Sequence, residues 1–385
     1  MTPYSRHCLF PKDIKEVVKV LKSDYLTQGN QINKFEKKIA KNCKSKYAVV
    51  VNSATSALHL ACLALGLKKN DYLWTVPITF VASANCGLYC GAKIDLVDID
   101  KESFNINVSS LEQKLIKAKK QNKLPKILIP VHLGGNPCNL DKIHFLAKKY
   151  KFKIIEDASH AFGSRYKSSV IGDCKYSDAV VFSFHPVKPI TSGEGGAVAC
   201  KDHKLYQKVK ILREHGIVRD KKLFKNKNNI QPWYFEQQHL GYNYRISDIN
   251  AALGSSQIDH IKRFSKKRNQ IAKIYKKKIS NKLVKFQKEE KNSFSAKHLF
   301  IIKVERKNHK KLFNYLRKEK IFVQLHYIPI YRHPYYKKKF KFNPKNFPNS
   351  ENYYSSAMSI PIFYSLKNKK QMEVINLINS FLRNQ

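Results

Sequence analysis

Short apolar segments alternate with segments of helical periodicity along the first half of the chain. Residues 47–51 form an apolar run, and the apolar positions of 54–65 then recur at helical spacing up to Gly66. Apolar strands separated by helices are typical of a mostly parallel sheet covered on both faces. The pattern therefore predicts an α/β fold. Further strands are predicted at 93–99, 127–131, 152–155 and 179–184, and helices at 13–21, from about 109, and at 140–150.

The pattern changes near Ser247. Residues 247–278 contain no proline and a single glycine, Gly254, which predicts one long helix. Shorter patterns follow, with a strand expected at 298–304 and a helix at 311–318. We therefore expect a large domain over residues 1–250. The long connecting helix and a smaller α+β domain would occupy residues 251–385.

Length and hydropathy favour a soluble globular protein. A chain of 385 residues with 43% hydrophobic content can build a large core in about two domains. No apolar run approaches the roughly 18 residues that a membrane span needs. No apolar core of a signal peptide follows the N-terminus. We expect a cytoplasmic protein without a membrane partner.

The eight cysteines are scattered and show no metal-binding or disulfide pattern. None lies in a Cys-x-x-Cys pair, and none follows Cys200. A zinc site or a disulfide framework would need clustered or regularly spaced cysteines. Reduced, mostly buried thiols and no metal site are therefore expected.

The formal net charge of +45 allows two interpretations. It could attract polyanions such as nucleic acid or a phosphorylated substrate. It could equally reflect a lysine-rich solvated surface, because runs such as 276–278 and 337–339 sit among ordinary polar and apolar residues. No helix-turn-helix spacing, zinc finger or RNA-binding aromatic signature accompanies the charge. We therefore expect no nucleic-acid partner, and an advantage for anionic substrates stays compatible with the composition.

One lysine follows a predicted strand directly. Lys188 lies just beyond residues 179–184, in a loop closed by the glycine-rich segment 193–196. The carboxyl edge of a sheet is the usual place for chemistry in open α/β folds. A lysine amine there can form a Schiff base with an aldehyde, including that of pyridoxal 5'-phosphate (PLP).

A strand-to-helix transition upstream could bind the phosphate of such a cofactor. Residues 49–58 pass from a strand through a small polar turn into a helix. Free backbone N–H groups at the helix start attract anions, and the hydroxyls of Thr55 and Ser56 add donors. Ordinary N-capping by Ser53 or Thr55 would explain the same residues.

Two further segments could serve a pyridine ring. Glu156 and Asp157 follow a buried strand, and alternation predicts that they point in different directions. One carboxylate at a strand's end can pair with a protonated pyridine nitrogen. A helix cap or a surface ion pair would explain the carboxylates as well. Asp157 is the better candidate, since small residues and His160 follow it, and Glu156 could be purely structural. Phe80 could stack on the ring, although an aromatic opening a helix is also a common core residue.

These segments occur in one order that resembles a known family. The chain is similar to the PLP-dependent nucleotide-sugar aminotransferases of the DegT/DnrJ/EryC1/StrS family, from Tyr4 to about Leu366. The resemblance implies fold type I, with a mostly parallel seven-stranded sheet flanked by helices and a smaller C-terminal α+β domain. It is carried by residues 52–58, 77–80, 156–160, 183–188, 193–196, 212–216 and 241–245.

The details within the family are similar to the branch that acts in pseudaminic acid biosynthesis. The segments concerned are 26–29, 77–86, 184–188, 232–238 and 326–329. The resemblance implies transfer of an amino group from L-glutamate to UDP-2-acetamido-2,6-dideoxy-β-L-arabino-hex-4-ulose, a UDP-linked 4-keto-6-deoxy sugar. The product would be UDP-4-amino-4,6-dideoxy-N-acetyl-β-L-altrosamine. It also implies a homodimer with shared active sites.

The resemblance assigns roles to matching positions. Lys188 would carry the cofactor and later move the proton, Asp157 would pair with the pyridine nitrogen, and Asn243 would complete the phosphate site of the partner subunit. The implied cofactor-binding residues are Thr55, Ser56, Phe80, Asp157, His160, Ser183, Lys188 and Asn243. The implied substrate-binding residues are Tyr4, Leu26, Thr27, Gln28, Gly29, His185, His326, Tyr327, Ile328 and Pro329.

Three positions depart from the family pattern. Pro189 stands where this branch often has histidine, and Gln28 and Ser192 each replace a threonine common in the wider family. The dehydratases of the family replace the lysine with histidine, whereas this chain keeps Lys188. Aminotransferases for perosamine, bacillosamine or legionaminic acid precursors stay open as alternatives, as does a nucleic-acid-binding protein built on the same fold.

Overall fold

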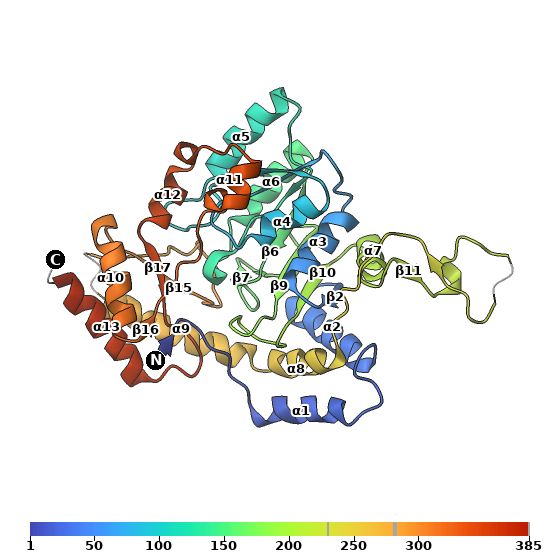
Figure 1. The fold of residues 1–385 in the computed structure, drawn as a ribbon, viewed down its shortest axis with the longest axis horizontal. Coiled ribbons are helices and arrows are strands. Elements are labelled where there is room, and N and C mark those ends of the chain that lie inside the picture. The colour runs from blue at the N-terminus through green and yellow to red at the C-terminus, as the bar shows by residue number, and fades with distance from the viewer. Residues whose placement is uncertain (229–230, 280–282, 384–385) are drawn as a thin grey trace.

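A seven-stranded sheet forms the centre of the computed structural model, which describes residues 1–228, 231–279 and 283–383 (Figure 1). The strand order is β2-β10-β9-β6-β5-β3-β4. All neighbours pair in parallel except β10, which is antiparallel to both β2 and β9. The expectation of a mostly parallel sheet is confirmed. The strands are β2 (Tyr47–Val51), β3 (Tyr72–Thr75), β4 (Lys93–Leu96), β5 (Ile127–Leu128), β6 (Lys153–Asp157), β9 (Ala179–Ser183) and β10 (Gly196–Cys200).

Helices cover both faces of this sheet because its strands are apolar on both sides. In β2, Val49 and Val51 join one buried cluster, whereas Ala48 and Val50 join the other. The first cluster includes α3 (Ala54–Ala64), α4 (Ala82–Tyr89) and α7 (His203–Arg213). The second includes α2 (Asn30–Cys43), α5 (Val108–Lys120), α6 (Leu140–Tyr150) and parts of α8 (Asp248–Ile258) and α9 (Ile261–Lys278).

The C-terminal part of the chain builds a separate buried cluster from residues between Ile271 and Leu382. Within the described residues it contains an antiparallel sheet of β13 (Lys285–Phe286), β15 (Phe300–Lys303) and β17 (Ala357–Ile360). The helices α9, α10 (Arg306–Lys318) and α13 (Asn368–Arg383) pack there. The division of the chain after residue 250 stays a prediction.

Smaller elements connect these layers. The N-terminal β1 (Thr2–Pro3) pairs in parallel with β16 (Ile321–Phe322), which ties the start of the chain to its C-terminal part. The segment that holds β11 (Ile217–Val218) and β12 (Glu236–Gln237) projects from the body (Figure 1). The others are α1 (Pro11–Leu21), β7 (Arg165–Tyr166), β8 (Ser169–Val170), β14 (Ser293–Phe294), α11 (Pro334–Lys339), α12 (Pro348–Tyr354) and 3₁₀ turns at Leu133–Gly135, Lys221–Leu223, Ile330–Arg332 and Pro344–Asn346.

The prediction of one continuous helix over 247–278 is wrong, since α8 ends at Ile258 and α9 begins at Ile261. The N–H groups of Asp259 and His260 bond to carbonyls three residues back, at 3.1 and 3.0 Å, which tightens the turn. Asp259 also forms ion pairs of 2.9 Å with Lys12 and with Lys38. Side-chain contacts with α1 and α2 therefore accompany a break that helix propensity alone does not reveal.

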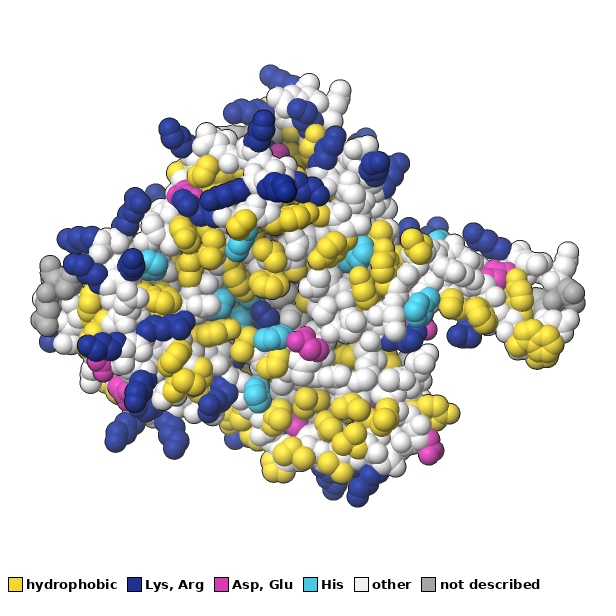
Figure 2. Space-filling view, in the orientation of Figure 1, with side chains coloured by type: hydrophobic (Ala, Val, Ile, Leu, Met, Phe, Trp, Pro, Cys, Tyr) yellow, Lys and Arg dark blue, Asp and Glu magenta, His cyan; other side chains and the backbone are white. Residues whose placement is uncertain are grey.

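Two further expectations concern burial and surface. Six of the eight cysteines, all of which lie in the described ranges, are buried, as the sequence indicates. No helix in the described ranges is long and apolar enough to cross a membrane. Lysine and arginine side chains are spread over the visible face of the molecule rather than gathered in one patch (Figure 2).

Candidate active site

A cavity of about 540 Å³ lies at the carboxyl ends of β6 and β9. Several histidine side chains gather around the hollow near the centre of the visible face (Figure 2). A volume of this order is typical of small-molecule sites. Ten residues singled out from the sequence line the cavity: Tyr4, Thr55, Phe80, Asp157, His160, Ser183, His185, Lys188, His326 and Tyr327.

The start of α3 faces this cavity and provides an anion site. Ser53 caps the helix, accepting the N–H of Ser56 at 3.1 Å, so the capping role considered for Ser53 is real. The first amides of a helix have no partner within it, which leaves those of Ala54 and Thr55 at the cavity wall. Ser183 from β9 adds a hydroxyl beside them. Backbone amides and hydroxyls together suit a phosphate group.

Gly196 allows the helix start to sit this close to the sheet. A Cβ atom at Gly196 would lie 2.5 Å from the backbone nitrogen of Ala54, a distance that no side chain tolerates. Gly196 pairs with Val51 on one side and Ser183 on the other. The glycine thus brings β2, β9 and the start of α3 together.

Asp157 ends β6 with its carboxylate at the cavity and both oxygens held. Oδ2 accepts a hydrogen bond from the Ser83 hydroxyl at 2.6 Å, and Oδ1 accepts the N–H of Ser159 at 3.1 Å. The residue is 6% exposed. A carboxylate so placed can pair with a cationic nitrogen of a bound group.

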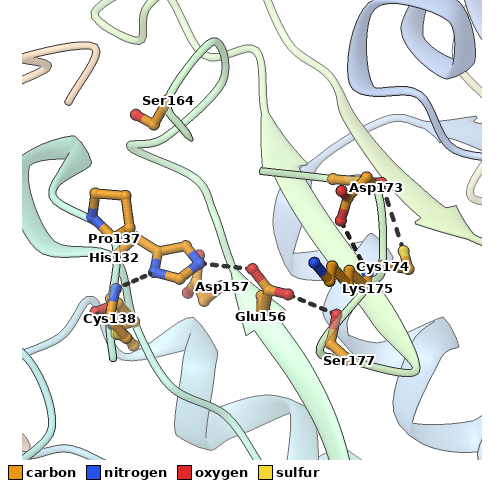
Figure 3. Close-up of polar contacts among 12 residues, drawn as sticks. His132, Pro137, Cys138, Glu156, Asp157, Ser164, Asp173, Cys174, Lys175 and Ser177 are labelled. Carbon is orange, nitrogen blue, oxygen red and sulfur yellow. Dashed lines mark hydrogen bonds and ion pairs between the residues drawn. The ribbon is translucent and has the colours of Figure 1, made fainter. Parts of the chain in front are cut away.

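Glu156 points away from the cavity, as strand alternation predicts. Its Oε2 atom lies 2.8 Å from Nε2 of His132, and its Oε1 atom accepts the Ser177 hydroxyl at 2.6 Å (Figure 3). The backbone N–H of Cys138 donates to Nδ1 of His132 at 3.0 Å, so the ring proton is on Nε2 and faces Glu156. Glu156 is therefore a structural residue beneath the site.

Lys188 reaches the same cavity from the loop between β9 and β10. Its backbone N–H donates to the carbonyl of His185 at 2.9 Å, and Thr191 Oγ1 donates to the carbonyl of Phe184 at 3.0 Å. Burial lowers the pKa of Lys188 to about 8, although the nearby Asp157 carboxylate acts in the opposite direction. A useful fraction of the amine is therefore neutral near physiological pH.

This pKa can be measured in cofactor-free protein. Only a neutral amine reacts with an acylating reagent, so labelling of Lys188 should rise as the pH passes through about 8. The reference is the ordinary lysine value of about 10.4. Competitive labelling read by peptide mass spectrometry resolves the two. A midpoint for Lys188 at the ordinary lysine value would contradict the effect of burial.

His160 and Tyr327 form a hydrogen-bonded pair with a defined direction. The backbone N–H of Gly134 donates to Nδ1 of His160 at 3.2 Å, so the ring proton is on Nε2 and is donated to the Tyr327 hydroxyl at 3.0 Å. Burial and the neighbouring Lys188 hold the pKa of His160 well below its usual value, in keeping with a neutral ring. The Tyr327 proton is thereby free to be donated into the cavity. The Phe80 ring, 58% exposed, lies 6.0 Å from that of Tyr327.

Tyr4 and His326 line the cavity beyond this pair. Their rings pack edge to face with centroids 4.8 Å apart, and Nδ1 of His326 lies 2.9 Å from the Ser359 hydroxyl. Burial lowers the pKa of His326 to about 3, so the ring is neutral. The two residues join the N-terminal segment to the C-terminal part of the chain in the cavity wall.

Other residues singled out from the sequence lie outside this chain's cavity lining. Ser56 is buried behind the helix start, where its hydroxyl donates to Asn52 at 2.6 Å. Residues 26–29 are instead held by Asp248, which accepts the Gly29 N–H at 2.8 Å. Asn243 is exposed on the surface. Ile328 is 41% exposed, and Pro329, although buried, does not line the cavity either.

Sequence reasoning missed some polar residues of the site. Thr79 and Glu194 line the cavity, and Ser83 contacts Asp157 from behind it. Thr79 and Ser83 both lie within segment 77–86, in which Phe80 was the one residue given a role of its own. Their hydroxyls, spaced four residues apart at a helix start, were the available signal.

The sheet order fits an aminotransferase of fold type I, and so does a cavity lined by Lys188, Asp157 and the helix start. The chain belongs to the DegT/DnrJ/EryC1/StrS aminotransferase family, whose model matches residues 8–379. The family predicted from the ordered motifs is thereby confirmed.

Named relatives align with nearly the whole chain. UDP-4-amino-4,6-dideoxy-N-acetyl-beta-L-altrosamine transaminase from Campylobacter jejuni is 38% identical over 386 aligned residues, which cover 99% of this chain and 98% of the relative. The solved structure of PseC from Helicobacter pylori, an aminotransferase involved in the biosynthesis of pseudoaminic acid, superposes with a TM-score of 0.90 at 30% identity and covers 100% of both chains.

A further solved structure bears on the cofactor. The PLP form of a putative sugar aminotransferase, Spr1654 from Streptococcus pneumoniae, matches with a TM-score of 0.89 at 25% identity and covers 99% of this chain and 98% of its own. Aminotransferases of this family are PLP enzymes. The chain is therefore a sugar aminotransferase by family, with a nucleotide sugar as the class of substrate that its relatives imply.

Proposed function

We propose that this protein transfers the amino group of L-glutamate to C4 of UDP-2-acetamido-2,6-dideoxy-β-L-arabino-hex-4-ulose. The product would be UDP-4-amino-4,6-dideoxy-N-acetyl-β-L-altrosamine, a precursor of pseudaminic acid. The observation that carries the chemistry is the placement of Lys188 and Asp157 in one cavity with the start of α3. The similarity to the Campylobacter jejuni transaminase supports the particular sugar.

The residues present fit PLP. Its phosphate suits the amides of Ala54 and Thr55 with the Ser183 hydroxyl, and its pyridine nitrogen suits Asp157. When bound, PLP supplies an aldehyde that accepts amines and a ring that takes up electron density. Phe80 offers an exposed aromatic face within the same cavity. The cavity thus offers hydrogen-bond donors for the phosphate, a carboxylate for the pyridine nitrogen and an aromatic face for the pyridine ring.

The chain's own groups then bind, orient and move protons. Lys188, neutral in part because of burial, can remove a proton from the amino donor in the first half-reaction and can deliver a proton to the sugar carbon in the second. The Asp157 carboxylate would stabilise a positive charge on the cofactor's pyridine nitrogen. The Tyr327 hydroxyl can donate a hydrogen bond to a bound oxygen, since His160 supplies the proton that it accepts. Tyr4 and His326 lie where a nucleotide sugar would enter.

The proposal includes assembly of the protein as a homodimer. Asn243 and residues 26–29 are surface residues outside this chain's cavity, although the family pattern gives them roles in ligand binding. The backbone bridge between Thr27 and Ser247 places residues 26–29 next to the segment that begins at Asn243. Both segments would complete the cavity of a second copy.

Product identification tests the substrate directly. Purified protein, PLP, L-glutamate and the UDP-linked 4-keto sugar should yield a 4-amino sugar and 2-oxoglutarate in equal amounts. NMR of the product should show the configuration at C4 and C5 that defines the altrosamine. The 4-keto precursors of perosamine, bacillosamine and legionaminic acid serve as comparison substrates. Higher kcat/KM for one of these would overturn the proposed sugar and leave the reaction type intact.

A further inference from the structure

Ser83 contacts the carboxylate of Asp157 from outside the cavity lining. It is fully buried in the first turn of α4, and its hydroxyl lies 2.6 Å from Oδ2 of Asp157. The two residues are 74 positions apart, so the contact is tertiary rather than local. A hydrogen bond of this length to a charged acceptor is among the stronger kinds in proteins.

The hydroxyl of Thr79 extends this contact into a chain with one direction. Oγ1 of Thr79 lies 2.7 Å from Oγ of Ser83. A carboxylate oxygen accepts hydrogen bonds, so the Ser83 hydroxyl is the donor in its contact with Asp157. Ser83 can therefore only accept from Thr79. The one proton of the Thr79 hydroxyl is shared between Ser83, at 2.7 Å, and the carbonyl of Phe80, at 3.2 Å. The three oxygens form the sequence Thr79 to Ser83 to Asp157.

The same turn of the chain also places the aromatic ring of the site. The N–H of Ser83 donates to the carbonyl of Phe80 at 3.2 Å, and Phe80 lines the cavity. Asp157 is held at its second oxygen by the N–H of Ser159. The start of α4 therefore relates the position of the ring to that of the carboxylate.

We propose that Ser83, supported by Thr79, is a positioning residue for Asp157. It fixes the carboxylate in the rotamer that leaves a lone pair for the cationic nitrogen of the bound cofactor. This inference rests on the proposed function, because that nitrogen belongs to PLP. Ser83 itself contacts neither cofactor nor substrate and acts through Asp157 alone.

Equilibrium binding of PLP to cofactor-free protein tests this role without an activity measurement. Ser83→Ala should weaken PLP binding about tenfold, since one hydrogen bond to a charged group is lost. Thr79→Val keeps the hydrogen bond from Ser83 to Asp157 and should weaken PLP binding by no more than about threefold. Ser83→Cys, with a weak donor of similar size, should fall between wild type and Ser83→Ala. Thermal unfolding of each cofactor-free variant verifies that it is folded.

The decisive comparison repeats Ser83→Ala in an Asp157→Asn background. If Ser83 acts through the carboxylate, the tenfold loss should disappear there. An equal loss in both backgrounds would overturn the inference and make Ser83 a packing residue. The inference would also be overturned if Ser83→Ala did not weaken PLP binding in protein that keeps Asp157.

A matched control uses another fully buried serine. The Ser164 hydroxyl donates to the carbonyl of Gly135 at 2.8 Å and accepts the N–H of Ala296 at 2.9 Å. Ser164→Ala should lower the unfolding temperature without changing the PLP dissociation constant. Wild-type protein that takes up no PLP would refute the proposed function. Normal uptake by both wild type and Ser83→Ala would refute only the role of Ser83.

Discussion

Lys188→Ala is expected to lower turnover by at least about four orders of magnitude, because under the proposed function the change removes the amine that would carry the cofactor and move the proton. The absorbance that a lysine-bound cofactor gives near roughly 400–430 nm should disappear with it. PLP should still associate, since the start of α3, Ser183 and Asp157 are intact. Steady-state assays and spectra of the variant after PLP addition measure both effects.

Because the chain contains many lysines, a substitution of an exposed lysine serves as a control. Lys101 is exposed, and Lys101→Ala should leave both turnover and spectrum unchanged. Lys188→Ala should remain folded, since it removes a partly buried amine whose charge burial disfavours. Turnover in Lys188→Ala within tenfold of wild type would refute Lys188 as the catalytic base.

Asp157→Asn is expected to lower kcat by about a thousandfold, since a neutral amide cannot stabilise the positive charge that, under the proposed function, the carboxylate would stabilise at the ring. The change should also move the labelling midpoint of Lys188 below about 8, because Asp157 raises the pKa of that amine. Rapid kinetics and site-resolved labelling report the two effects independently. An unchanged kcat would contradict the assignment of Asp157.

Glu156→Gln supplies the matched control, one residue earlier on the same strand. Glu156 accepts hydrogen bonds from His132 and Ser177 and does not line the cavity. The amide should cost about 1–3 kcal/mol of unfolding free energy, since it presents a donor to one of these partners. Activity per folded molecule should stay near wild type. The two neighbouring changes thus separate catalysis from stability, and a reversed pattern would exchange their roles.

The apolar periodicity located some elements well and others not at all. Residues 47–51 and 140–150 were predicted with the bounds that β2 and α6 have, because each is a strongly patterned segment. β3 and β10 were not predicted. β3 has four residues and ends shortly before Pro77, and β10 consists of small residues after a glycine-rich loop. The strand conformation of β10 depends on pairing with β2 and β9, which lie far away in sequence.

The residues of the candidate site likewise fall into those that local sequence pattern predicts and those that it does not. Lys188 and Asp157 could be predicted because each follows a recognisable strand. The opposite orientation of Glu156 also follows from alternation, and the structure bears it out. Contacts between distant residues could not be predicted: His160 meets Tyr327 across 167 positions, and Ser83 meets Asp157 across 74. Such pairs depend on how the elements pack, which a single sequence does not reveal.

The placement of β10 between β2 and β9 has a consequence for synthesis on the ribosome. Among the residues that the structure describes, β2 pairs with no strand of the sheet other than β10. Residues up to 200 must therefore have emerged from the ribosome before β2 can join the sheet. The anion site at the start of α3 is incomplete until then, and β1 waits longer still, for its partner at residues 321–322. The emerging polypeptide therefore carries an unpaired apolar strand for much of its translation, a period in which chaperone protection would matter most.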